Sequence, residues 1–208
     1  VSISPDGNYC LVADLNNKKN KKIIISTQQV SLFAGSPSAS SGSSNGVGSN
    51  SLFRTPVGIE ISPDGTFALV ADQNNNQIRY LILSTQQVVL LAGSTTSAVG
   101  SANGVGSSAS FNDPSGVDIS PDNSYCLVAD FSNYQIRKII LSTKQVSLFA
   151  GQTTSGTSNG VGSNAQFNNP IDIAISSDGT YCLVADQLNN QMRKIIIATQ
   201  QVTLFAGS

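Results

Sequence analysis

The stretch that decides the fold is PVGIEISPDGTFALVADQNNNQIR, residues 56–79. It opens with an alternating apolar run, which the turn residues Pro63-Asp64-Gly65 end. Residues 66–71 form a short apolar run that is typical of a buried strand. The Asn-rich turn at 72–76 leads into a third run, and a fourth ends at Gly93. The unit therefore predicts four short antiparallel strands, without the capped apolar stripe of a helix.

This unit recurs along the chain, in steps of 58, 58 and 56 residues. The Val-Ala-Asp triplet and the Ala-Gly pair mark each copy unchanged, and the Ser-Pro-Asp-Gly turn marks each copy with small changes. Four short strands per repeat are typical of a propeller blade. The sequence thus predicts one repeat domain over 1–208, with blades at 1–35, 56–93, 114–151 and 170–207, and Ser/Gly/Asn-rich connectors at 36–55, 94–113 and 152–169.

The repeat resembles a known family. Pro-x-Gly-Ile, Asp-Gly, Leu-Val-Ala-Asp and Asn-x-Gln-Ile-Arg follow one another as in the NHL repeat, best at 56–79 and 114–137. The connector segment 103–106, with Phe111 and Pro114, is similar to an NHL connector. The resemblance implies an all-β fold, a β-propeller built of four-stranded antiparallel blades, with four NHL-like blades in this chain. The first unit departs from it, because Asn20 stands where the other units carry Ile or Met.

The number of blades bears on ring closure. NHL propellers usually have about six blades and close through a strand shared between the two ends. Four blades lead us to expect part of a larger propeller or array, or open ends that pair with another copy. We expect either of these rather than a closed four-bladed ring.

Composition excludes several functions. The net charge is −1 and charged residues make up only 11%, so we expect no nucleic-acid partner. No apolar stretch approaches the roughly 20 residues of a membrane span. Histidine is absent, which removes Ser-His-Asp and Cys-His constellations and the commonest metal ligand. The family includes a lyase domain with metal-bound histidines, which this sequence cannot reproduce. We therefore predict no enzyme, no catalytic or metal residues and no cofactor.

Three sets of residues recur at equivalent blade positions. The cysteines are expected to be buried small hydrophobes, too far apart for disulfides. The aspartates that end the Val-Ala-Asp triplet suggest a calcium or acid–base ring, but a structural role before each turn fits better. The arginines of the third strand, with Lys21 in the first unit, are expected to pair with an acid or cover the sheet rather than bind an anionic ligand. These positions are Cys10, Cys126 and Cys182; Asp14, Asp72, Asp130 and Asp186; and Arg79, Arg137 and Arg193.

The connectors are the candidate contact surface. Long segments of this kind are often functional, and we expect all of them on one face of the ring. Their shared Asn-Gly-Val-Gly segment gives the candidate contact residues Asn45, Val47, Asn103, Val105, Asn159 and Val161. A candidate basic patch, Lys18, Lys19, Lys21 and Lys22, is better explained as a solvated hairpin tip than as a polyanion site.

Two functions fit this description. The first is a non-enzymatic interaction scaffold whose propeller loops bind a protein or glycan partner. The alternative is a structural repeat protein that self-assembles into an extracellular or surface filament or coat. Low charge and Ser/Asn-rich loops favour an extracellular or cell-surface place for either.

Overall fold

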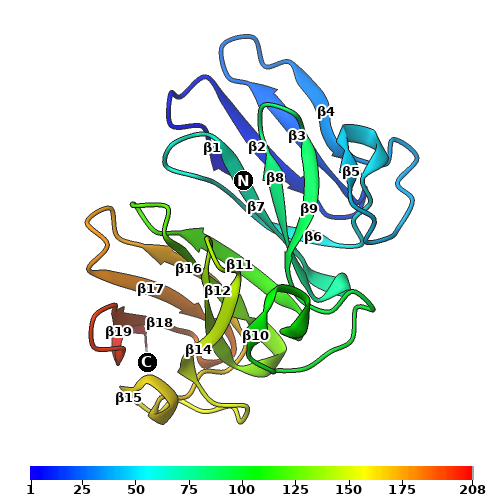
Figure 1. Ribbon diagram of the computed structural model, residues 1–208. Helices are drawn as coiled ribbons and strands as arrows, with labels where there is room; N and C mark the ends of the chain where they lie inside the picture. Colours follow the sequence, from blue (N-terminus) through cyan, green and yellow to red (C-terminus); the bar gives the residue numbers. More distant parts are fainter. Residues whose placement is uncertain (208) are drawn as a thin grey trace.

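The computed structural model describes residues 1–207 as four antiparallel sheets that follow one another along the chain (Figure 1). The first sheet contains β1 (Ser2–Ile3), β2 (Tyr9–Asp14), β3 (Lys19–Ile24) and β4 (Val30–Gly35). The second contains β6 (Pro56–Ile61), β7 (Phe67–Asp72), β8 (Gln77–Ile82) and β9 (Gln87–Ala92). The third contains β11 (Pro114–Ile119), β12 (Tyr125–Asp130), β13 (Gln135–Ile140) and β14 (Gln145–Gly151), and the fourth β16 (Pro170–Ile175), β17 (Tyr181–Asp186), β18 (Gln191–Ile196) and β19 (Gln201–Gly207).

Each connector adds a fifth strand to the blade that follows it. The added strands are β5 (Gly46–Val47), β10 (Gly104–Val105) and β15 (Gly160–Val161), and each pairs with the outer strand of its blade. A 3-10 turn follows each of them: η1 (Gly48–Asn50), η3 (Gly106–Ser108) and η5 (Gly162–Asn164). The shared half of each connector is therefore ordered secondary structure, and it extends the blade outward.

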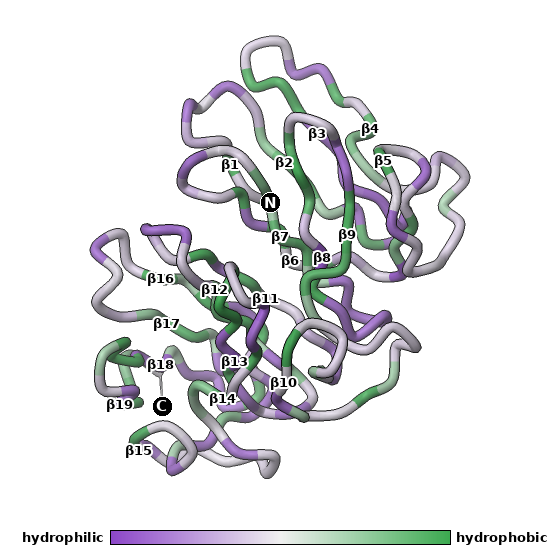
Figure 2. The backbone as a smooth tube through the Cα atoms, in the orientation of Figure 1, coloured by the Kyte–Doolittle hydropathy of each residue, from purple (hydrophilic) through white to green (hydrophobic). Residues whose placement is uncertain are grey.

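The turns between second and third strands explain the Asn-rich sequence there. Three are 3-10 turns: η2 (Gln73–Asn75), η4 (Phe131–Asn133) and η6 (Gln187–Asn189). The residue after η2, Asn76, is left-handed with φ 52°, a conformation that Asn tolerates better than most residues. Figure 2 shows hydrophobic stretches along the strands and hydrophilic residues at most of the turns between them.

The core is divided among the three interfaces between neighbouring blades. Each interface combines the face of one blade, a Phe from the connector and the opposite face of the next blade. The connector Phe is fully buried at all three interfaces, as Phe53, Phe111 and Phe167. The small residues Ala68, Cys126 and Cys182 are also fully buried at these interfaces, where a small side chain lets two sheets approach closely.

Within the described part of the chain, the first and last blades each leave one face uncovered by another blade, and the ring is open (Figure 1). In the last blade Phe205 is 57% exposed, whereas the equivalent Phe149 is 2% exposed. In the first blade Val30 is 55% exposed, whereas the equivalent Val146 is fully buried. The predicted all-β fold of four-stranded antiparallel blades is confirmed, and the four sheets form part of a propeller.

The first blade keeps a polar residue in its core. Asn20 is fully buried on β3, and its amide nitrogen and oxygen have no hydrogen-bond partner among residues 1–207. Ile78 and Ile136 occupy the equivalent place and are fully buried.

Within residues 1–207, no helix is long and apolar enough to cross a membrane.

Candidate binding surface

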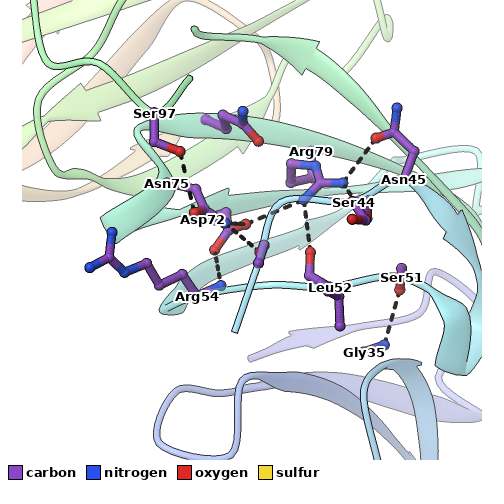
Figure 3. Close-up of polar contacts among 12 residues, drawn as sticks. Gly35, Ser44, Asn45, Ser51, Leu52, Arg54, Asp72, Asn75, Arg79 and Ser97 are labelled. Carbon is purple, nitrogen blue, oxygen red and sulfur yellow. Dashed lines mark hydrogen bonds and ion pairs between the residues drawn. The ribbon is translucent and has the colours of Figure 1, made fainter. Parts of the chain in front are cut away.

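A buried carboxylate lies at the end of the second strand in each of the last three blades. Figure 3 shows that of the second blade, Asp72, with its polar contacts. Asp72, at the end of β7, is fully buried. Its Oδ1 accepts hydrogen bonds from the backbone N–H groups of Arg54 (2.9 Å) and Thr55 (3.2 Å). Its Oδ2 accepts from Asn75 Nδ2 (2.7 Å) and pairs with Arg79 Nη1 at 3.3 Å. Every lone-pair direction of this carboxylate is thus committed within the chain, as a structural role requires.

The arginine of this pair also holds the connector. Arg79 is fully buried, and its Nη1 donates to the backbone oxygen of Leu52 at 3.0 Å. Its Nη2 donates to the oxygen of Ser44 at 3.2 Å and to Asn45 Oδ1 at 2.9 Å. The guanidinium carbon lies 5.4 Å from the centre of the Phe53 ring. One planar cation therefore joins the blade to two points of the connector, a geometry that Lys cannot supply.

The third and fourth blades repeat this arrangement. Asp130 and Arg137 pair at 3.0 Å, and Asp186 and Arg193 at 3.1 Å, all four side chains being fully buried. Both arginines bind the asparagine of their own connector, Asn103 at 2.9 Å and Asn159 at 2.8 Å. The first blade differs, because Lys21 pairs with a partly exposed Asp14 at 2.8 Å.

Burial sets the electrostatics of these pairs. Desolvation raises the pKa of Asp72 above its usual range, against the hydrogen bonds that lower it. The same cause raises the pKa of Asp130 to about 6. Desolvation lowers the pKa of Arg79, and the charge of Asp72 opposes it. Each pair therefore depends on both partners, because either charge alone would be buried without compensation.

The connector valines are the exposed residues of the connector segments that these arginines hold. Val47, Val105 and Val161 are 53%, 53% and 47% exposed. Val47 pairs with Gln87 at the start of β9, and the following Gly48 N–H donates to the oxygen of Gln86 at 2.9 Å. This turn lies at the opposite end of β8 from the Asn76 turn. The expectation that the connectors lie wholly on one face is therefore wrong, because their shared half runs along the outer blade edge.

The lysines of the first blade lie on and before β3, and three of them have contacts within the chain. Lys19 Nζ donates to the oxygen of Pro37 at 3.0 Å. Lys21 pairs with Asp14, and Lys22 Nζ lies 3.9 Å from the centre of the Tyr9 ring. Lys18 occupies the left-handed turn position before β3, with φ 55°.

The sequence reasoning missed an acidic cavity at the propeller axis. It has a volume of about 780 Å³, is lined mainly by β6, β11 and β16, and includes Glu60, Asp118 and Asp172. Burial, with the charge of Asp118, raises the pKa of Glu60 to about 7. Asp118 accepts backbone hydrogen bonds from Ile119 (2.8 Å) and from Ile175 of the next blade (2.5 Å). Asp118 thus joins two neighbouring inner strands. No three His, Cys, Asp or Glu side chains of residues 1–207 are grouped to hold a metal ion.

The cysteines have the environment of small core residues. Cys126 and Cys182 are fully buried, Cys10 is half-buried, and all three are free thiols. Burial raises the pKa of the Cys126 thiol, and that of Cys182 to about 12. These two thiols therefore stay protonated, which makes them poor nucleophiles.

Comparison with known proteins places this repeat. No family model matches the chain. NHL repeat-containing protein 2 of Bos taurus is 33% identical over 163 residues, which cover 74% of this chain and 22% of that protein. This chain belongs to the NHL-repeat family. A second match is Protein SUPPRESSOR OF QUENCHING 1, chloroplastic, of Arabidopsis thaliana, 34% identical over 69% of this chain and 14% of that protein. The NHL chain thus spans about a fifth or less of these relatives.

Solved structures share the NHL blade arrangement. A protein of unknown function from Bacteroides thetaiotaomicron superimposes with a TM-score of 0.73 and 22% identity, over 93% of this chain and 46% of that one. An auxiliary nutrient binding protein from the same organism gives a TM-score of 0.71 and 15% identity, over 99% of this chain and 46% of that one. At such identities the likeness concerns the fold, and in both cases the matched chain is about twice as long.

Proposed function

We propose that this chain is a non-enzymatic binding scaffold whose NHL connectors contact a protein or glycan partner. The observation that carries the proposal is that each connector presents an exposed valine while a buried arginine fixes the connector backbone. Val47, Val105 and Val161 face solvent at equivalent places, while Arg79, Arg137 and Arg193 fix the backbone around them. A pre-ordered exposed surface binds with little loss of conformational entropy, which favours affinity.

The same arrangement argues against catalysis. The recurring acids are the most obvious candidates for acid–base chemistry, but Asp72, Asp130 and Asp186 are buried and each accept hydrogen bonds from the chain itself on both carboxylate oxygens. The sequence has no histidine, and burial raises the pKa of the thiols of Cys126 and Cys182. One fold neighbour is named as a nutrient binding protein, which agrees with a binding role on this architecture.

The test screens the purified chain on a glycan array and against a displayed peptide library. A triple variant, Val47→Asp with Val105→Asp and Val161→Asp, is screened beside it, because a charge at each exposed site disrupts an apolar contact without entering the core. The matched control is Val99→Asp, which changes a 66% exposed valine in the variable half of one connector.

The proposal predicts one or more specific binders whose affinity falls more than about ten-fold in the triple variant and stays unchanged in the control. It is wrong if the triple variant binds as well as the original chain, or if neither library yields a saturable binder.

A further inference from the structure

A second hollow lies between the second and third blades, away from the axis. This interblade groove has a volume of about 440 Å³, within the roughly 300–1,000 Å³ range of small-molecule pockets. The second blade lines it with residues of β7, β8 and β9. The third blade lines it with the turn after β11, at Asn123, and the turn after β13, at Lys144.

The positions at which the second or the third blade alone departs from the repeat fall mostly at this groove. Over the positions equivalent to 1–35, the third blade alone differs at two positions where the other three blades share one residue: Asn123 replaces Gly, and Lys144 replaces Gln. Both residues line the groove. At five positions the second blade alone differs from a residue that the other three blades share. Three of these five residues line the same groove: Phe67, Tyr80 and Leu91. The other two, Ala68 and Leu81, lie in the core between the first and second blades.

At this groove the second blade has a stacked pair of aromatic side chains where the other blades have a lysine over a tyrosine ring. In the other three blades a lysine lies over the ring of a tyrosine, with Nζ 3.9, 4.0 and 4.2 Å from the ring centre. In the second blade Tyr80 takes the place of that lysine and stacks on Phe67, with ring centres 4.6 Å apart and planes inclined by 16°. Leu91 replaces a larger Phe, and Val89 replaces Ser or Thr. The second blade thus lines the groove with more apolar residues than the other blades carry at these positions, and Leu91 fills less space than a Phe would.

The two polar substitutions give the groove a defined polarity. Lys144 is exposed at its rim and forms no ion pair with any residue of 1–207. Asn123 Oδ1 is buried there without a hydrogen-bond partner in the same part of the chain. None of the residues that line the groove is acidic. An aromatic wall beside a free ammonium group complements a flat apolar molecule that carries a negative charge.

We propose that this groove binds a small aromatic anion, with its ring against Phe67 and Tyr80 and its charged group near Lys144. A hydrogen-bond donor on the ligand would satisfy Asn123 Oδ1. This binding is separate from the connector surface, since it uses neither the exposed valines nor a macromolecular partner. Either proposal can fail while the other stands.

The experiment titrates the chain with 8-anilinonaphthalene-1-sulfonate, an aromatic anion, by calorimetry and dye fluorescence. The main variant, Tyr80→Lys with Leu91→Phe, restores the residues of the other three blades and so keeps side chains that this fold already accepts. A second variant, Lys144→Gln, likewise restores the common residue. Circular dichroism checks that each variant is folded. The control is Phe205→Ser, which changes the exposed face of the last blade, where the dye could also adsorb.

We expect one dye molecule per chain, an affinity about ten-fold lower in the double variant and several-fold lower in Lys144→Gln, and no change in Phe205→Ser. A transplant sharpens the test: Tyr125→Phe, Lys138→Tyr, Ser147→Val, Phe149→Leu, Gly179→Asn and Gln200→Lys together place the distinguishing residues of the groove between the third and fourth blades. The expected result is a second bound dye. The proposal is overturned if the original chain does not bind the dye, or if binding is lost only with Phe205→Ser.

Discussion

Replacing Arg137 by Met removes the cation that joins the third blade to its connector. In the native chain Arg137 is fully buried and donates to Ala102 O and Ser110 O (both 3.1 Å), Asn103 Oδ1 (2.9 Å) and Asp130 Oδ2 (3.0 Å). Met fills much of the volume but leaves the Asp130 carboxylate buried without its counter-charge. Breaking a buried pair in this way costs about 3–5 kcal/mol, so we expect a loss of that size in the free energy of unfolding at pH 8.

The loss should depend on pH. Burial already raises the pKa of Asp130 to about 6, and removing the arginine raises it further. Between about pH 4, where the unfolded carboxyl titrates, and this raised value, the folded state binds more protons than the unfolded state. Stability of the variant therefore falls as the pH rises through that window, and the destabilisation at pH 5 should be smaller than at pH 8.

Urea unfolding followed by circular dichroism at pH 5 and pH 8 measures both effects. Lys138→Met is the matched control: it removes the neighbouring cation on the same strand, whose ammonium group lies 4.0 Å from the centre of the Tyr125 ring and should contribute less than about 1 kcal/mol. The reasoning is refuted if Arg137→Met costs no more than the control, or if its cost is the same at both pH values.

Three further predictions follow from single positions. Asn20→Ile should stabilise the chain by about 1–3 kcal/mol, because it removes a buried unpaired amide and supplies the residue found at Ile78; a lower urea midpoint than in the original chain would contradict this. Gly58→Ala should destabilise it by about 1–3 kcal/mol, since an added Cβ would collide with the backbone oxygen of Ser115, whereas an unchanged midpoint would show that the inner strands can separate freely. Glu60→Gln should flatten the pH dependence of stability between about pH 4 and 7, because a carboxyl whose folded pKa is about 7 makes stability fall as the pH rises. Parallel pH profiles for the variant and the original chain would show that Glu60 does not cause this pH dependence.

The strands and their order were predictable because each copy of the unit repeats the same alternation and the same turn residues. The recurring aspartates and arginines were also recognisable as structural positions, although the sequence did not show that Arg79 binds both Asp72 and the connector. The fifth strand was not predictable, since a two-residue strand such as Gly46–Val47 has no periodicity of its own.

Glu60 and Asp118 occupy equivalent positions, but the axial acids escaped detection because this position carries a different residue in every blade: Ser2, Glu60, Asp118 and Ala174. Asp172 occupies the place of Gly116 in the preceding blade, two positions before Ala174, the equivalent of Asp118. A search for repeated residues passes over such a cluster, and only the approach of neighbouring inner strands brings its members together. The interblade groove did leave a signal of the opposite kind, in the departures from the repeat at Tyr80 and Asn123.

Amide hydrogen exchange of the connectors tests most directly the claim that buried arginines turn them into a fixed binding surface. Residues 46–51, 104–109 and 160–165 contain the short strand and 3-10 turn of each connector. The account predicts that their paired amides exchange far more slowly than the Ser/Thr-rich tracts before them, and that Arg137→Met speeds exchange in the second segment alone. Exchange as fast as in those tracts would show that the connectors are mobile, and would contradict the scaffold described above.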